Sequence, residues 1–243
     1  YIDKESLPTL GTVSRNENGY PIGYFFGYKA IGVFQTQEEI DSYISPATGK
    51  PIQPNAAPGD TKFEDLNGDG VISDDNEDRT MIGKPNPDWM VGLTVAADWN
   101  GFDLSAFFQG SFGADVFDAL RRYELAAVNY TSDALERWTG PGTSNSMPRI
   151  VLGDTPKNFR PSTLLVHDAS FLRLRNLQVG YTLPAQLTRK AYIQRLRFYA
   201  SFDNLLTITG YKGMDPEIGS TMGIDKGVYP QARVYTFGLN LTF

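Results

Sequence analysis

Apolar and polar residues alternate strictly over the end of the chain, from Tyr235 to Phe243. Every second residue there is aromatic or leucine, and the residues between them are threonine, glycine or asparagine. Successive side chains of a β-strand point to opposite faces, so this pattern predicts a strand with one wholly apolar face. Such a strand fits a transmembrane barrel, whose outer face meets lipid, and it also fits the edge of a soluble sandwich. A chain that ends on an aromatic strand favours the barrel, because termini usually fray into solvent.

The same alternation predicts a hairpin in the middle of the chain. Residues 89–99 are apolar at every odd position, and residues 102–109 return with apolar residues at even positions. Asn100-Gly101 lies between them, and this dipeptide is the strongest two-residue signal for a hairpin turn. Five residues of the hairpin are expected to face lipid: Val91, Leu93, Val95, Leu104 and Ala106.

Two further strands are predicted towards the C-terminus. Residues 170–181 alternate with one change of phase, which a β-bulge near Asn176 would reconcile. Residues 195–203 place apolar residues opposite charged and polar ones. Long segments rich in Gly, Pro and Asp join the strands at one end, and short turns join them at the other. This asymmetry is typical of barrels with extracellular loops, since long structureless loops are uncommon in compact soluble domains.

The composition of the chain excludes several classes of function and of structure. The net charge of -6 and the sequence pI of about 4.9 argue against a nucleic-acid-binding surface, which needs a basic patch. The sequence has no cysteine, which excludes disulfides and thiolate metal sites. No apolar run approaches the roughly 20 residues of a membrane helix. The first residues carry no signal peptide, so we expect the chain to be a fragment or a processed product.

Residues 65–78 form an acidic stretch that resembles an EF-hand loop. Oxygen-bearing side chains stand at its first, third and fifth positions, and glycine stands at the sixth. The twelfth position is Asn76 where an EF-hand has glutamate, and Glu77 follows one residue late. The alternative is an acidic loop stabilised by its own Asx turns. The expected ligands of a structural Ca²⁺ are Asp65, Asn67, Asp69, Val71 through its carbonyl, and either Asn76 or Glu77.

The sequence contains no residue set that points to catalysis. His167 is the only histidine, and it is expected to be exposed or in a loop. We find no phosphate-binding loop and no nucleophile elbow, so the chain is predicted not to be an enzyme and no catalytic residue is assigned. Four arginines face away from the apolar side of two strands, where they are expected to be ordinary charges that line a lumen. The alternatives are pairing with carboxylates and contact with a substrate. The residues are Arg173, Arg175, Arg195 and Arg197.

A series of short motifs runs in order from about residue 20 to the end of the chain. The motifs are Gly23-x-x-x-Gly27-Tyr28, Gly32-x-Phe34-Gln35, Pro58-Gly-Asp60-x-Lys-Phe63, Asp65-Leu-Asn-Gly-Asp-Gly70, Asp78-Arg79, Ile82-Gly-Lys-Pro-Asn-Pro87, Arg137-Trp138, Phe171-Leu-Arg-Leu-Arg-Asn176, Gly180-Tyr-x-Leu-Pro184, Asn204-Leu205, Gly210-Tyr-x-Gly-x-Asp-Pro-Glu217, Tyr229-Pro230 and Gly238-Leu-Asn240. Each motif is weak alone, but in this order the set resembles the SusC-like TonB-dependent transporters.

This resemblance implies an all-β fold in which residues 1–243 are the C-terminal strands of a large antiparallel transmembrane β-barrel with long extracellular loops. The EF-hand-like loop at 65–78 belongs to this part, and the plug and the N-terminal barrel strands are absent from the chain. The last strand resembles the signal that the outer-membrane assembly machinery reads. The residues of that signal are Thr236, Gly238, Leu241 and Phe243.

The resemblance also implies a function in the outer membrane of a Gram-negative bacterium. Such proteins import glycans or oligopeptides, driven through a TonB complex that binds the absent N-terminal region. The implied partners are a SusD-like surface lipoprotein, the remaining barrel and plug of the same transporter, and the lipid bilayer. The alternative from a different class is a Ca²⁺-dependent glycan-binding β-module at the cell surface.

Overall fold

The computed structural model describes residues 13–121, 129–218 and 222–243, and the chain divides into two compact units. The first unit contains residues 1–86, 115–167 and 219–227. The second contains residues 87–114, 168–218 and 228–243. Because each unit gathers three separate stretches of the chain, each depends on contacts between residues that are distant in the sequence.

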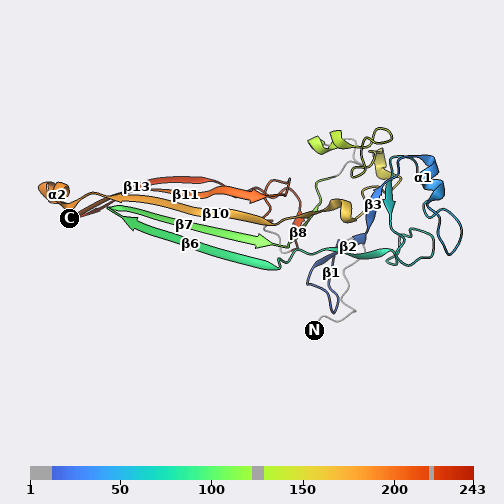
Figure 1. Cartoon of the computed structure of the whole chain (residues 1–243), viewed down its shortest axis with the longest axis horizontal. Helices are drawn as coiled ribbons and strands as arrows, with labels where there is room; N and C mark the ends of the chain where they lie inside the picture. Colours follow the sequence, from blue (N-terminus) through green and yellow to red (C-terminus); the bar gives the residue numbers. More distant parts are fainter. Residues whose placement is uncertain (1–12, 122–128, 219–221) are drawn as a thin grey trace. The chain divides into compact units, whose positions relative to one another are not determined.

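The second unit is one antiparallel sheet of five long strands, in the order β13-β11-β10-β7-β6 (Figure 1). The predicted strands are all present, and β11 extends several residues beyond its expected end. The bounds are β6 (Trp89–Trp99), β7 (Phe102–Phe112), β10 (Phe171–Thr182), β11 (Arg195–Thr209) and β13 (Val234–Thr242).

The predicted hairpin turn joins β6 to β7. Asn100 and Gly101 both have positive φ angles, 53° and 87°, as a type I′ turn requires. Trp99 pairs with Phe102 directly beside the turn, and the register continues without a break to Trp89 and Phe112. The local sequence therefore fixes both the turn and the pairing of these two strands.

The predicted bulge lies in β10 at Arg175. Leu174 and Asn176 pair with the adjacent β7 residues Phe108 and Phe107, so Arg175 is the extra residue of β10 relative to β7. The register with β11 shifts at the same place, where two β11 residues oppose Arg175. On β11 the same irregularity falls at Asn204, whose φ of 53° is in the left-handed region that asparagine tolerates. The bulge keeps the apolar residues of β10 on one face, as the change of phase in the sequence predicted.

Short turns lie at one end of this sheet and long connections at the other. The short helix α2 (Ala185–Thr188) and the 3-10 helix η4 (Arg189–Ala191) carry the chain from β10 to β11, at the same end as the β6–β7 turn. The connections after β7 and after β11 are long. No helix of the described residues is long and apolar enough to span a membrane.

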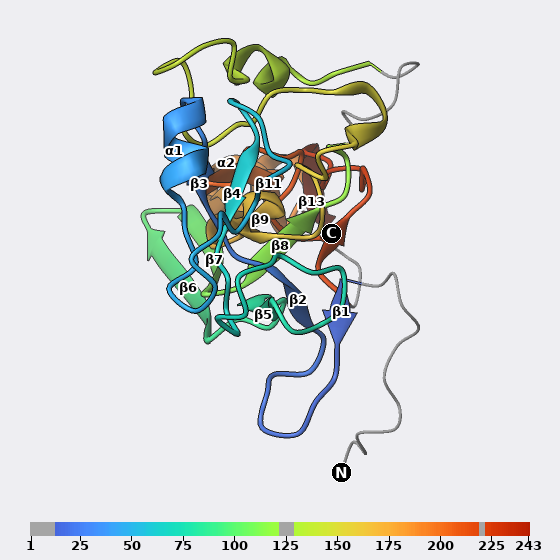
Figure 2. The ribbon, with the colours of Figure 1, turned by 90° about the vertical axis from the view of Figure 1, so that its right-hand side faces the viewer.

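The described residues of the first unit form three small sheets and one α-helix (Figure 2). One sheet has the order β1-β2-β5, a second has the order β12-β8-β9, and β3 pairs with β4. The bounds are β1 (Ser14–Arg15), β2 (Tyr24–Tyr28), β3 (Ala30–Val33), α1 (Gln37–Ser42), β4 (Thr61–Phe63), β5 (Arg79–Gly83), β8 (Asp115–Asp118), β9 (Val166–Asp168) and β12 (Ile224–Asp225), with 3-10 helices η1 (Ser132–Glu136), η2 (Leu152–Asp154) and η3 (Thr163–Leu165).

The first unit has a hydrophobic core of its own. Phe25, Phe117 and Leu165 form a buried cluster, although more than 40 residues separate each from the next in the chain. Residues 115–118 look mixed and partly helical in the sequence, but they form β8, because they pair in parallel with β12. Long-range pairing, which the local sequence does not reveal, decides this strand.

Candidate functional site

One face of the five-stranded sheet is apolar on every strand. Its side chains are uncovered: the exposed fractions of Trp89, Leu93 and Phe237 are 71%, 59% and 76%. A contiguous apolar surface over five strands is far larger than a soluble monomer exposes, and it has the pattern of a lipid-facing barrel wall. The register places these residues on it: Val91, Leu93, Val95, Trp99, Phe102, Leu104, Phe108, Leu174, Leu177, Val179, Tyr181, Leu196, Phe198, Phe202, Leu206, Tyr235, Phe237, Leu239 and Leu241.

Ala106 is the least exposed of the five hairpin residues that were predicted to face lipid. Ala106 lies on the apolar face with the other four hairpin residues, but only 8% of its surface is exposed. Its register partners are Val95 on β6 and Leu177 on β10, and both side chains are larger. Its small side chain is therefore covered by its own sheet, while Val91, Leu93, Val95 and Leu104 are exposed.

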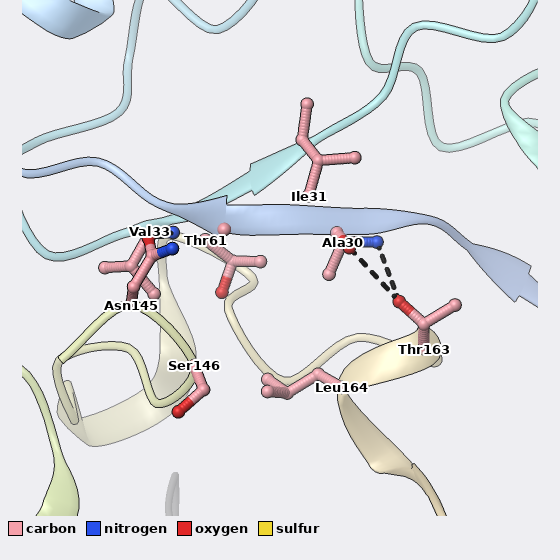
Figure 3. Close-up of a pocket in the computed structure, with 9 residues that line it drawn as sticks. Ala30, Ile31, Val33, Thr61, Asn145, Ser146, Thr163 and Leu164 are labelled. Atoms are coloured by element: carbon pink, nitrogen blue, oxygen red, sulfur yellow. Dashed lines mark hydrogen bonds between the residues drawn. The ribbon is translucent and has the colours of Figure 1, made fainter.

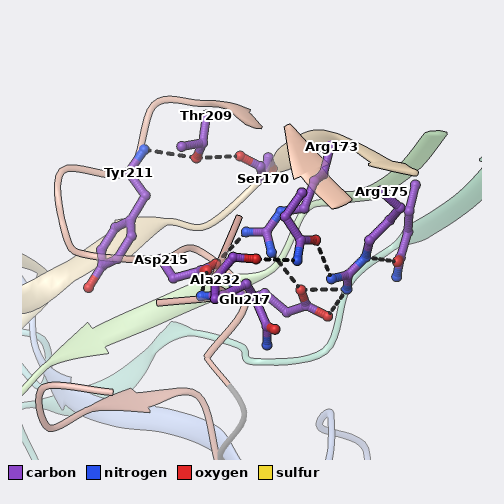
Figure 4. Close-up of polar contacts among 11 residues, drawn as sticks. Ser170, Arg173, Arg175, Thr209, Tyr211, Asp215, Glu217 and Ala232 are labelled. Carbon is purple, nitrogen blue, oxygen red and sulfur yellow. Dashed lines mark hydrogen bonds and ion pairs between the residues drawn. The ribbon is translucent and has the colours of Figure 1, made fainter. Parts of the chain in front are cut away.

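The opposite face of the sheet carries charged residues, and three of the four predicted arginines, Arg173, Arg175 and Arg197, pair there with carboxylates. Arg197 on β11 donates from Nε to Asp103 on β7 at 2.8 Å. At the other end of the strands, Arg173 and Arg175 on β10 meet two carboxylates of the loop that follows β11 (Figure 4). We call this group the arginine–carboxylate cluster; its members are Arg173, Arg175, Asp215 and Glu217.

The arginine–carboxylate cluster holds the loop after β11 against the sheet. Arg173 Nη2 donates to Asp215 Oδ1 at 2.5 Å, and its Nη1 donates to Glu217 Oε2 at 3.2 Å. Arg175 Nη2 donates to Glu217 Oε2 at 2.6 Å, and its Nε donates to Gln109 Oε1 at 2.6 Å. The bulge thus directs Arg175 towards the loop. The arginine–carboxylate cluster therefore joins two separate sequence motifs, 171–176 and 210–217.

Asp215 is ionised within this cluster. Its burial opposes ionisation, but backbone N–H groups of Gln231 and Glu217 and the Arg173 guanidinium outweigh it and lower the pKa of Asp215. A lowered folded-state pKa means that the contribution to stability is present above the ordinary aspartate pKa and is lost as the pH falls through the lowered value. The loop is therefore held at neutral pH.

The acidic loop, residues 65–78, is closed by hydrogen bonds of its own carboxylates. Asp65 accepts from the backbone N–H of Gly68 at 2.8 Å and of Gly70 at 2.9 Å. Asp69 accepts from Val71 N–H at 2.9 Å. Asn67 Nδ2 donates to Asp69 at 3.1 Å and to Glu77 at 2.9 Å, so the side chains of Asn67, Asp69 and Glu77 converge. The described residues contain no group of three or more His, Cys, Asp or Glu side chains arranged for a metal.

A residue that the sequence analysis missed anchors this loop. The side chain of Asp78 is fully buried and accepts hydrogen bonds from Leu66 N–H and Ser73 N–H, at 3.2 and 2.9 Å. Tyr28 donates its hydroxyl to Ser73 O at 2.7 Å. Asn76, by contrast, turns towards Arg79, with Oδ1 at 3.5 Å from Nη1. Of the two alternatives for the last ligand, Glu77 is the one that lies near Asn67.

A second buried polar network joins three segments of the first unit. The Asp60 carboxylate accepts from Arg149 Nε at 2.6 Å and from Asn158 Nδ2 at 3.0 Å. Hydrogen bonding to Asp60 raises the pKa of Arg149. Gly59, at φ 91°, lies against Trp138. A Cβ at this position would stand 2.4 Å from the indole ring, so a larger residue would clash. In the sequence, Gly59, Asp60 and Trp138 belong to two separate motifs, and no motif includes Arg149 or Asn158.

The free edge of β3 is closed by side chains. Thr163 Oγ1 accepts from Ala30 N–H at 3.0 Å, and Asn145 Oδ1 accepts from Val33 N–H at 3.1 Å (Figure 3). A cavity of about 310 Å³ lies beside this edge, with Ser146 and Leu164 among its lining residues. Because the edge donors already have partners, this strand is protected from pairing with another chain.

His167 lies in β9 rather than in a loop, and its Nε2 is 3.9 Å from Asp118.

The last strand pairs with β11 along its whole length, from Val234 with Asp203 to Thr242 with Arg195. A Cβ on Gly238 would stand 2.5 Å from the Tyr199 ring, so the glycine allows this aromatic side chain to approach the strand closely. Among the described strands, β13 has a partner on one side only. That Thr236, Gly238, Leu241 and Phe243 form an assembly signal stays a prediction.

These features define the class of the protein: the sheet is a segment of a transmembrane β-barrel wall, apolar outside and charged inside. Over 93% of its length the chain is 34% identical to TonB-dependent receptor P3 of Formosa agariphila. Over 95% of its length it is 30% identical to TonB-dependent receptor SusC of Bacteroides thetaiotaomicron. The predicted resemblance to SusC-like TonB-dependent transporters is thereby confirmed. No protein-family model matches the chain.

Solved structures agree with these relatives. The chain superposes on a structure of the RagAB peptide importer in the open-open state with a TM-score of 0.71, at 25% identity over 97% of its length. A second structure, of the RagAB peptide transporter, gives 0.70 at 28% identity. The chain spans between 21% and 27% of the length of the curated relatives. Their names describe receptors, which agrees with the prediction that the chain is not an enzyme.

Proposed function

We propose that this chain is part of a TonB-dependent importer in the outer membrane of a Gram-negative bacterium. The observation that carries the proposal is the five-stranded sheet, whose apolar face has no charged residue and whose opposite face bears paired arginines. A wall of this kind separates lipid from an aqueous lumen. The remaining barrel strands, the plug and the TonB-binding region then come from outside residues 1–243.

The imported substrates are glycans or oligopeptides, and the transporter works with a SusD-like surface lipoprotein. The similarity to SusC and to a structure described as a peptide importer supports this part of the proposal. The alternative, a Ca²⁺-dependent glycan-binding module, is disfavoured by the apolar face of the sheet. A soluble module would need a second layer to cover that face.

Uptake by cells tests the importer. We expect cells that make the intact transporter and its neighbouring lipoprotein to take up radiolabelled oligopeptides or oligosaccharides, and to lose this uptake when TonB is deleted, because import against a gradient needs energy. The measurement is label accumulated per cell, with a strain lacking the transporter as the baseline. Equal accumulation with and without TonB would contradict the proposal.

We also propose that the acidic loop binds one structural Ca²⁺. The oxygen atoms of Asp65, Asn67 and Asp69 are a donor set that suits this hard cation, and the Val71 carbonyl and Glu77 complete it. Asn76 remains the alternative to Glu77, and the turn of Asn76 towards Arg79 disfavours it. The hydrogen bonds that already hold the backbone of the loop support this proposal. Binding would require the Asn67 side chain, whose Nδ2 donates to Asp69 and Glu77, to turn its oxygen to the ion.

Replacing Asp69 tests the calcium proposal. We expect Asp69→Ala to abolish Ca²⁺ binding measured by calorimetry on the intact protein, because the substitution removes the central anion of the loop. Transport should persist, since the proposed ion is structural and Asp69 does not line a cavity. The matched control is Asp41→Ala, an exposed aspartate of α1 outside the loop. If the unaltered protein binds no Ca²⁺, or if Asp69→Ala binds it equally well, the loop is stabilised by its Asx turns alone.

A further inference from the structure

A second cavity of the first unit has the size of a small-molecule site. Its volume is about 660 Å³, and sites for small ligands range from about 300 to 1,000 Å³. Three segments that are distant in the sequence line it: residues 48–56, residues 70–72 of the acidic loop, and residues 155–160. The cavity lies wholly within the first unit.

One part of the lining is apolar and fixed. Ile52, Val71 and Pro156 contribute carbon surface. Gln53 is held on both sides of its amide: Nε2 donates to the backbone oxygen of Thr61 at 3.1 Å, and Oε1 accepts from Phe63 N–H at 2.8 Å. A wall that is already held in place loses little entropy when a ligand binds.

The charges of the lining are unbalanced. Lys50, Lys157 and Arg160 all border the cavity. The only carboxylate in the lining is Asp60, and its charge is matched by Arg149. Asp74 is not in the lining, but it pairs with Lys157 and lies 3.9 Å from Arg160. The hydrogen bond from Lys157 lowers the pKa of Asp74. The three cations therefore have one carboxylate, that of Asp74, available to pair with them, although the net charge of the chain is -6.

Arg160 is the cation that is most firmly held. Its guanidinium lies over the rings of Tyr28 and Phe63, with centroid distances of 4.6 and 4.9 Å. Its Nη1 atom is buried and has no hydrogen-bond partner within the described part of the chain. The nearest carboxylate oxygen, Asp74 Oδ1, is 3.9 Å away, which is too far for a hydrogen bond. A positive charge fixed beside the cavity favours an anion within it.

We propose that this cavity binds the carboxylate of a small anionic solute. The carboxylate is placed between Lys50, Lys157 and Arg160, and the uncharged remainder of the solute lies on the apolar wall. Two kinds of solute carry such a group: a short peptide with a free C-terminus and an acidic sugar. The inference does not depend on transport, because it rests only on residues of the first unit.

Calorimetry on the intact transporter in detergent tests the site. The probes are N-acetyl-Ala-Pro-Ala with a free carboxylate, the same peptide as its C-terminal amide, digalacturonate, and neutral digalactose. Lys50→Gln and Lys157→Gln each remove one cation from the lining. Lys226→Gln is the matched control, because Lys226 is an exposed lysine of the same unit that does not line the cavity.

We expect at least one carboxylate probe to bind and its neutral counterpart not to bind. Lys50→Gln and Lys157→Gln should each weaken binding about tenfold, since each removes one charge-assisted contact. Lys226→Gln should leave binding unchanged. Binding of the peptide alone, of the sugar alone or of both identifies the solute. The proposal is overturned if neither carboxylate binds, or if the control weakens binding as much as the two lining variants do.

Discussion

Deletion of Phe243 is expected to remove most of the intact transporter from the outer membrane. Phe243 follows the last pair of β13 with β11, and its side chain is exposed beyond the sheet. Leu241 lies two residues earlier on the apolar face. In a closed barrel the free edge of β13 must pair with a strand from outside this chain, because an open edge is intolerable in hydrocarbon. We infer that assembly of that last pairing depends on the terminal aromatic residue.

The comparison variant for this deletion is Thr242→Ala. Thr242 belongs to the polar face, so the change should leave the amount of transporter in isolated outer membranes near that of the unaltered protein. Quantitative immunoblots of the two variants give the measurement. Similar amounts of both variants would show that Thr236, Gly238, Leu241 and Phe243 do not form an assembly signal.

Replacement of Arg173 by alanine is expected to release the loop after β11 from the sheet. Arg173 and Asp215 are 1% and 5% exposed, so the substitution leaves a buried carboxylate without its cation. Breaking a buried ion pair in this way costs about 3–5 kcal/mol. Limited trypsin digestion should then cut after Lys212, which is exposed on the same loop, far faster than in the unaltered protein.

Two further variants separate this effect from a general loss of stability. Lys190→Gln changes one charge at the end of the sheet with the short turns, and cleavage after Lys212 should stay slow. Arg173→Gln combined with Asp215→Asn removes both charges, and it should destabilise the loop less than Arg173→Ala, because no unpaired charge is left buried. If Arg173→Ala leaves the cleavage rate unchanged, the arginine–carboxylate cluster does not hold the loop.

The sequence by itself determined the second unit. Alternation with a period of two located its strands, Asn100-Gly101 located the tight turn, and the change of phase near Asn176 located the bulge. These features are local, because a strand's faces and a turn's φ angles follow from neighbouring residues. The same alternation identified the apolar face, and the ordered motifs identified the family.

Only the tertiary structure decided how the first unit folds and which partners the polar residues of both units bind. The pairing of β8 with β12, the contact of Gly59 with Trp138, and the binding of Arg173 to Asp215 each join residues at least 40 positions apart. No periodicity or motif spacing encodes such contacts. They depend on which segments share a core and on which buried charges must find partners, and the folded chain settles both together.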